Sequence, residues 1–261
     1  MAINSTSSSE YVLYYHPYSV CSLMVLNTLV WKGSAKRRED EIAVQFREVD
    51  IFHEEQLSED FLCNINNHGQ VPVLAHSSKV DAPITDSLKI TNWLATKYPD
   101  LMPTEHEAEI RQKLNDLHAL NYFSLSFPGR PQIAQQLEAN VQRRLQDSSI
   151  SDRYRKALEF KLGVTKRDKS GGLVPAVTAE NEKNAKSLLS ELSDKLRGPE
   201  SWIYGEKPTA IDAHLVVFIA RMMDVGREQL IPEKLRDYTH WAMQKPEWVN
   251  MMGGRSTMIP H

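Results

Sequence analysis

The sequence predicts an α/β domain followed by an all-α domain. Strand-like and helical segments alternate between residues 11 and 98, no strand pattern follows Pro103, and the composition changes near residues 99–104. At 261 residues the chain is long enough for two domains. We therefore expect a disordered tail at 1–10, an α/β domain at 11–99 and a helical domain at 104–261.

The first domain is expected to follow the order βαβαββα. Residues 11–15 are rich in valine and tyrosine and precede His16-Pro17, which is typical of a short strand. Residues 19–31 are apolar on almost every side, so they predict a helix that is covered on more than one face. The remaining expected elements are strands at 45–50, 71–75 and 80–84, a short helix at 57–65 and an amphipathic helix at 87–98.

The second domain is expected to consist of helices joined by short connections. The pattern predicts helices at 105–127, 132–146, 152–162, 179–196, 210–225 and 232–245, with a flexible connection at 166–175. Residues 143–169 hold nine Lys or Arg against four Asp or Glu. Such runs are usually solvated surface, and a patch for an acidic partner is the alternative.

Composition excludes several classes of function. A formal net charge of −3 gives no general attraction to nucleic acid or to an anionic membrane. No apolar run approaches the roughly 20 residues that a spanning helix needs, and the serine-rich start lacks an apolar secretory core. The two cysteines, Cys21 and Cys63, favour a reducing compartment, and no metal-ligand spacing is present. We expect a cytoplasmic protein that binds no metal.

The first candidate site is the turn that precedes the helix at 19–31. Ser19 is a favourable N-cap, and a helix N-terminus has unpaired N–H groups and the positive end of the helix dipole. An anion such as a thiolate is stabilised there, and the Ser19 hydroxyl can donate a further hydrogen bond. Tyr14 and Tyr18 are alternative donors, and an ordinary helix cap is the alternative interpretation.

Two further segments have the chemistry of a peptide-binding site. If the Val71–Pro72 bond is cis, the Val71 N–H and C=O can pair with a short peptide, although only about 5–6% of X-Pro bonds are cis. Asp86 and Ser87 begin the helix at 87–98, where Ser87 can bind a carboxylate and Asp86 an ammonium group. A plain cap is again the alternative.

A capping box marks the helix at 210–225. Thr209 and Asp212 have the Ser/Thr-x-x-Asp/Glu spacing and precede an apolar run. We expect a structural role, the stabilisation of a buried helix.

The order and spacing of these segments resemble the glutathione S-transferase family. A strand leads into Ser19-x-Cys21-Ser22, Val-Pro-Val-Leu follows some 50 residues later, and Asp-Ser lies fourteen residues after Pro72. The segment 204–212 is similar to the family's C-terminal Gly-x-x-x-Ser/Thr-x-x-Asp signature. Ser19 and Cys21 match the first serine and the cysteine of the zeta-class Ser-Ser-Cys motif, while Val20 replaces the second serine. The length and the extra material at 147–176 are more similar to fungal members, including those of secondary metabolism.

The resemblance implies a thioredoxin-like domain, a bundle of helices, a glutathione site and a homodimer. Ser19 would assist the thiolate, with Tyr18 and Cys21 as further catalytic candidates. Cys21 lies in an apolar helix, where packing is the favoured role and a redox thiol is the alternative. A small hydrophobic electrophile would lie between the domains. The implied glutathione contacts are Gln70, Val71, a cis Pro72, Asp86, Ser87 and His53, and the candidate pocket residues are Asn121, Tyr122, Ser126 and Arg130.

Three functions fit this resemblance. The first is conjugation of glutathione to an electrophile. The second is cis–trans isomerisation through transient addition of glutathione to a double bond, either biosynthetic or of the maleylacetoacetate isomerase type. The third is glutathione binding without catalysis. A glutaredoxin-like reductase is disfavoured, because Ser19-Val20-Cys21 is not a Cys-x-x-Cys pair.

Overall fold

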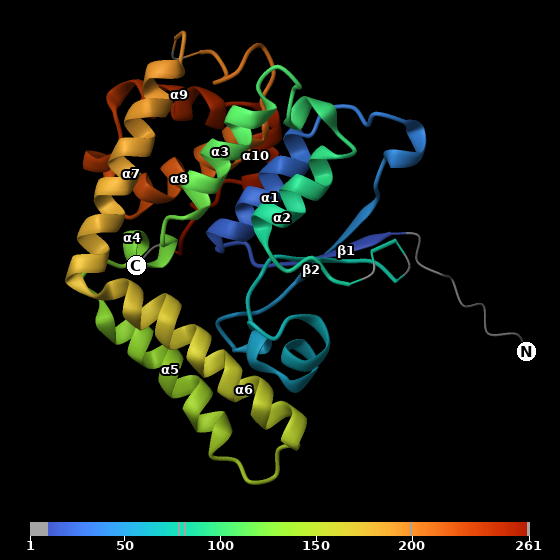
Figure 1. Cartoon of the computed structure of the whole chain (residues 1–261), viewed down its shortest axis with the longest axis vertical. Coiled ribbons are helices and arrows are strands. Elements are labelled where there is room, and N and C mark those ends of the chain that lie inside the picture. Colours follow the sequence, from blue (N-terminus) through green and yellow to red (C-terminus); the bar gives the residue numbers. More distant parts are fainter. Residues whose placement is uncertain (1–9, 78, 81, 199, 260–261) are drawn as a thin grey trace, which may run out of the picture.

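The computed structural model describes residues 10–77, 79–80, 82–198 and 200–259, and it shows a small sheet beside a large group of helices (Figure 1). The sheet order is β2-β1-β3. Strand β1 (Tyr11–Tyr15) pairs in parallel with β2 (Val44–Glu48) and antiparallel with β3 (Val73–Ala75). Apart from Glu10, the predicted tail lies outside the described residues.

Two helices cover one face of this sheet. Tyr11 and Leu13 of β1 belong to the same buried cluster as residues of α1 (Val20–Trp31) and α2 (Ser87–Ala95). Tyr14 points to the other face, where it packs with Val49, Phe61 and Val73. This alternation follows from the period of two along a strand.

Two predicted elements of the first domain differ from the structure. The strand expected at 80–84 is reduced, within the described residues, to a single bridge between Leu74 and Ile84. Pro83 lacks the N–H that a ladder requires, which accounts for the short pairing. The helix expected at 57–65 is split into a 3₁₀ turn (Glu55–Leu57) and one turn of π-helix (Phe61–Ile65).

The regular secondary structure of the second domain is entirely helical within the described residues. Its helices are α3 (Glu107–His118), α4 (Tyr122–Ser126), α5 (Pro131–Leu145), α6 (Asp152–Thr165), α7 (Pro175–Lys195), α8 (Ala210–Asp224), α9 (Glu233–Met243) and α10 (Pro246–Met252). The helix expected at 105–127 is interrupted because Asn121 caps α4, accepting a hydrogen bond from Ser124 N at 3.0 Å. Helix α10 was not predicted.

The segment predicted as a flexible connection instead continues α6 as helical turns. A π-helical turn (Lys166–Ser170) and a 3₁₀ turn (Gly171–Leu173) pack against α4. Asn121 Nδ2 donates to the Asp168 carbonyl at 2.9 Å. A Cβ atom at Gly172 would lie 2.3 Å from that amide nitrogen, so glycine is needed for this close approach.

Helix α8 joins the two domains into one core. Every residue from Ala210 to Met222 is buried, and α8 packs on α1. Asn27 Nδ2 of α1 donates to the Ala213 carbonyl at 2.8 Å, and His214 Nε2 lies 2.8 Å from Thr91 Oγ1 of α2. The predicted capping box at the start of α8 is confirmed, with Thr209 N donating to Asp212 Oδ2 at 2.8 Å.

The antiparallel hairpin of α5 and α6 contacts the first domain a second time, beside the segment 55–65 (Figure 1). Glu54 accepts hydrogen bonds from Arg143 at 2.7 Å and from Arg144 at 3.1 Å. Tyr154 Oη donates to the Leu57 carbonyl at 2.5 Å. Arg143 and Arg144 belong to the basic run at 143–169, which was predicted to be solvated surface. These two residues instead bind the hairpin to the first domain.

Lys161 makes a further buried contact of this kind. It is 8% exposed, and its Nζ donates to the Gly69 carbonyl at 3.2 Å. Burial lowers its pKa from 10.5 to about 7; nearby Lys169 lowers it further and Asp168 opposes the shift. Above about pH 7 the folded chain then holds fewer protons than the unfolded chain, so the free energy of unfolding rises with pH until the unfolded lysine titrates.

Lys161→Met is expected to remove this pH dependence. In the wild-type protein the lysine contributes a rise of about 2 kcal/mol in the free energy of unfolding between pH 7 and 9, and the variant lacks that rise. Urea denaturation at several pH values measures the difference. Lys156→Met, an exposed lysine of the same helix, is the matched control, and equal pH profiles for Lys161→Met and wild type would contradict the expectation.

Candidate functional site

The turn between β1 and α1 is built as the sequence predicts. Ser19 is the N-cap of α1, and its Oγ accepts from Ser22 N at 3.3 Å. Ser22 Oγ in turn accepts from His16 N at 3.2 Å, which fixes the turn from the other side. Because the Ser19 oxygen is used as an acceptor, its proton stays available to a ligand. Ser19 is partly exposed, so a ligand can reach it.

The starts of α1 and α2 lie next to each other. The Ser87 hydroxyl hydrogen-bonds to the Cys21 thiol, with Lys169 and Arg221 close enough to favour a thiolate. Burial outweighs these effects and raises the pKa of Cys21, so the thiol stays protonated at neutral pH. Part of Cys21 remains exposed, and its packing role stays a prediction.

Asp86 is the N-cap of α2, as predicted. One carboxylate oxygen accepts from Lys89 N at 2.9 Å, and the residue is exposed. The buried Ser87 follows it at the first helical position. A helix start with a hydroxyl and a carboxylate side by side can receive both an anionic and a cationic group.

The Val71–Pro72 peptide bond is cis, which confirms the conformation that the family resemblance implies. Val71 lies before β3 and outside its paired register. The preceding residues are held from two directions, since Asn66 Nδ2 donates to the Gln70 carbonyl at 2.8 Å and Lys161 binds Gly69. The peptide edge at Gln70 and Val71 is thus fixed beside the first domain's sheet.

An aromatic group borders the Ser19 turn. The Tyr18 ring lies 5.9 Å from the His16 ring and 6.3 Å from the Phe52 ring. His53, next to Phe52, is 87% exposed, and its Nδ1 lies 2.6 Å from Asp50. Tyr14 lies on the sheet face away from α1, so the structure does not bring this alternative donor to the turn.

His16 was missed in the sequence interpretation. Its Nδ1 lies 3.0 Å from the Val49 carbonyl, and burial lowers its pKa, so the ring is neutral at pH 7. Its Nε2 is buried without a hydrogen-bond partner within the described part of the chain. A histidine before a proline gives no sequence signal for this placement.

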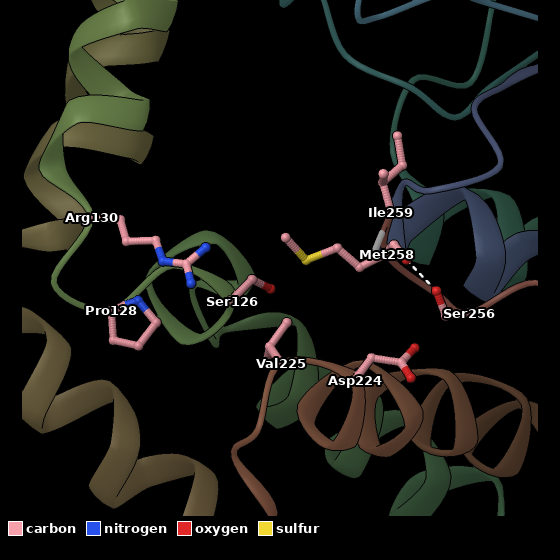
Figure 2. A pocket seen from close by; sticks show the side chains of 8 residues that line it. All are labelled: Ser126, Pro128, Arg130, Asp224, Val225, Ser256, Met258 and Ile259. Carbon is pink, nitrogen blue, oxygen red and sulfur yellow. Dashed lines mark hydrogen bonds between the residues drawn. The ribbon is translucent and has the colours of Figure 1, made fainter. Parts of the chain in front are cut away.

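A pocket of about 390 Å³ opens between α4, the end of α8 and the last described residues (Figure 2). The predicted Ser126 and Arg130 line it. The predicted Asn121 and Tyr122 are not among the lining residues. Tyr122 Oη donates to the Leu117 carbonyl at 2.9 Å, and its ring packs at a tilt against Phe218. The full lining is Ser126, Pro128, Arg130, Asp224, Val225, Ser256, Met258 and Ile259.

Arg221 connects this pocket to the Ser19 turn. The side chain is 5% exposed, and Nη2 donates to the Tyr18 carbonyl at 2.7 Å while Nε donates to Thr257 Oγ1 at 3.1 Å. Asp224 Oδ2 accepts from Thr257 N at 2.6 Å. Burial lowers the pKa of Arg221 to about 10, so it remains charged at neutral pH. The C-terminal wall of the pocket is therefore fixed to the residue before Ser19.

Among the described residues, no group of three or more His, Cys, Asp or Glu is arranged to hold a metal ion. No described helix is both long and apolar enough to cross a membrane.

Comparison with solved structures identifies the fold. No family model and no curated protein sequence matches the chain. Among solved structures, the beta-etherase LigF from Sphingobium sp. strain SYK-6 is similar at 19% identity and a TM-score of 0.68, covering 93% of this chain and 98% of that chain. A glutathione transferase from Burkholderia graminis, with two glutathione molecules bound per subunit, has 16% identity and a TM-score of 0.63, with 97% and 91% covered.

A glutathione transferase homologue from Sulfitobacter, with bound glutathione, is similar at 18% identity and a TM-score of 0.58, with 95% of this chain and 99% of that chain covered. These similarities extend over both domains. The chain therefore has the fold of the glutathione transferases, a thioredoxin-like domain followed by a helical domain.

Proposed function

We propose that the protein is a glutathione transferase that activates the glutathione thiol at Ser19 for attack on a small hydrophobic electrophile. The observation that carries this proposal is that three features of a glutathione site occur around the turn before α1. The capped start of α1 lies beside the start of α2, Val71 precedes a cis Pro72, and Arg221 ties the electrophile pocket to the same turn.

The residues present suit a tripeptide with two carboxylates and one ammonium group. Ser87 at the start of α2 would receive the γ-glutamyl carboxylate, and the second oxygen of Asp86 would receive the ammonium group. The Val71 N–H and C=O would pair with the cysteinyl backbone, with Gln70 alongside. His53 is a further candidate contact from the exposed loop after β2. Lys169 and Arg221 are the cations that favour a negative charge at Cys21, beside the same turn.

The proposed chemistry depends on lowering the pKa of the glutathione thiol. A free thiol has a pKa near 8.5 and is mostly protonated at pH 7. A shift of about two units corresponds to roughly 2.7 kcal/mol. A hydrogen bond from Ser19 together with the α1 N-terminus is sufficient for that. Tyr18 is the alternative donor, and Cys21 is not favoured as a nucleophile because burial raises its pKa.

Isomerisation is the second candidate, favoured by the zeta-like Ser-x-Cys motif. The thiolate would add to a conjugated carbon–carbon double bond, the intermediate would rotate, and the thiolate would leave again. A biosynthetic role, as in fungal secondary metabolism, fits the chain's resemblance to those members. Binding without catalysis is the third candidate.

Product analysis separates the three candidates. The purified protein is incubated with glutathione and a panel of halo-aromatics and polyenes, and the products are identified by mass spectrometry. A stoichiometric glutathione adduct supports transfer, an isomerised product with unchanged glutathione supports isomerisation, and binding with no turnover of any compound favours the non-catalytic candidate. The proposal also includes a homodimer in the cytoplasm; light scattering of the purified protein tests the dimer.

A further inference from the structure

Lys169 is a cation of the second domain that lies near the start of α1. It belongs to the π-helical turn at Lys166–Ser170, which packs against α4 and α5. Asn121 Nδ2 of the α4 cap donates to a carbonyl of this turn at 2.9 Å, and Ser170 Oγ donates to Glu138 of α5. The backbone that carries Lys169 is therefore held from two sides.

The ammonium group of Lys169 lies over an aromatic ring and not beside a carboxylate. Its Nζ is 4.6 Å from the centroid of the Phe123 ring, and within the described part of the chain it makes no hydrogen bond or ion pair. The neighbouring Asp168 is already bound by both ends of the Arg167 guanidinium, at 2.6 and 3.1 Å. Because contact with a ring face neutralises no charge, Lys169 keeps its charge and its N–H donors for a ligand.

The position of Lys169 is close to the proposed position of the glutathione sulfur. Lys169 and Arg221 are the two cations near enough to favour a negative charge at Cys21, in the first turn of α1. Arg221 already donates to the Tyr18 carbonyl at 2.7 Å and to Thr257 at 3.1 Å. Of these two cations, Lys169 is therefore the one whose hydrogen bonds remain for a bound molecule.

An apolar wall joins Lys169 to the pocket at the end of α4. The partly exposed rings of Phe123 and Phe127 lie 4.9 Å apart, and Pro128 lines the pocket. A small apolar molecule in the pocket can therefore extend along α4 to the ammonium group. Burial lowers the pKa of Lys169, and an ammonium group that has lost part of its water gains more from a negative charge than a solvated one.

We propose that Lys169 is a further catalytic residue, which binds the oxygen that becomes negative when the glutathione thiolate adds to a conjugated carbonyl compound. In this step a bond forms between sulfur and the β-carbon, the electron pair of the carbon–carbon double bond shifts toward the carbonyl group, and its oxygen becomes an enolate. The α-carbon then takes up a proton from solvent, which replaces the proton that the thiol released. Glutathione and the carbonyl compound are the only reactants.

This role rests on the proposed function and adds the class of its second substrate. The same enolate forms in conjugation and in isomerisation, so Lys169 would assist either reaction. A cation that meets its negative charge only in the transition state raises kcat and leaves KM almost unchanged.

A matched pair of electrophiles tests this role. The probes are benzylideneacetone, in which addition places negative charge on the carbonyl oxygen, and benzyl chloride, in which displacement places it on the departing chloride. Each is assayed with glutathione and corrected for the uncatalysed rate. Lys169→Met is expected to lower kcat for benzylideneacetone by about 10- to 100-fold with little change in KM, and to change kcat/KM for benzyl chloride by less than about threefold.

Two further variants are the controls. Lys169→Arg keeps the positive charge and is expected to restore kcat for benzylideneacetone to within about tenfold of the wild type. Lys166→Met replaces an exposed lysine of the same turn and should keep the wild-type rates with both probes. Thermal unfolding of each variant shows that the fold is intact.

An equal loss with both probes would place Lys169 at the glutathione thiol and overturn this inference. A wild-type rate of Lys169→Met with benzylideneacetone, or a loss confined to KM, would overturn it too. So would a wild-type protein that conjugates benzyl chloride or another electrophile but no conjugated carbonyl compound. Each of these results leaves glutathione transfer intact, whereas failure to convert any electrophile would overturn the proposed function itself.

Discussion

Replacing Ser19 with alanine is expected to lower kcat/KM by about 10- to 100-fold with any electrophile that the protein conjugates. The proposed role of the hydroxyl is to donate a hydrogen bond to the glutathione thiolate, and its loss returns the thiol pKa toward the free value near 8.5. The pH profile of kcat/KM should therefore shift to higher pH. The helix cap is lost in the same variant, which lowers the free energy of unfolding by about 1 kcal/mol.

Ser19→Thr is the matched control, because it keeps the hydroxyl and the cap. Its kcat/KM is expected to stay within a few-fold of the wild type, and thermal unfolding separates the loss of activity from the loss of the cap. An alanine variant with the wild-type rate and pH profile would show that another group, with Tyr18 the first candidate, activates the thiol.

Replacing Asp212 with alanine is expected to lower the free energy of unfolding by about 3–5 kcal/mol, because buried donors lose their acceptor. The carboxylate is 0% exposed. It accepts from Thr209 N at 2.8 Å, Thr209 Oγ1 at 2.7 Å, Ile203 N at 3.0 Å and Tyr238 Oη at 2.7 Å. Burial raises the pKa of Asp212 and these four hydrogen bonds oppose the rise.

Urea denaturation at pH 7 measures this loss. Ser151→Ala removes a comparable but exposed N-cap, which accepts from Tyr154 N at 3.1 Å, and should lower the free energy of unfolding by about 1 kcal/mol. Equal effects of the two variants would mean that Asp212 acts only as a local cap and does not also hold the loop before α8.

The parts of the site that depend on local chemistry could be predicted from the sequence. Ser19, Asp86 and the Thr209–Asp212 pair were identified as caps because a cap and its N–H partner lie three residues apart, so the signal is contained in a few neighbouring residues. Ser126 was placed at a pocket because it lies near the end of the helix predicted at 105–127, and it lines the pocket found in the structure.

The parts that depend on distant contacts could not be predicted. Arg221 binds the Tyr18 carbonyl across 203 positions, and Lys161 binds the Gly69 carbonyl across 92. Neither acceptor is a side chain, so no complementary residue marks the contact in the sequence. Arg221 does follow an apolar run in α8, and a charged residue in a buried helix is a usable signal. The prediction of a cis bond before Pro72 came from the family resemblance and not from the Val-Pro dipeptide itself.

Calorimetric titration of the full chain with reduced glutathione tests the central claim most directly. The account predicts saturable heat with one site per chain at or below millimolar glutathione. Binding should be weakened by replacing the buried Ser87, whose N–H and hydroxyl are proposed to hold the γ-glutamyl carboxylate. The absence of saturable heat up to about 10 mM glutathione would contradict it, because that concentration is tenfold, or about 1.4 kcal/mol, beyond the weakest binding that the account allows.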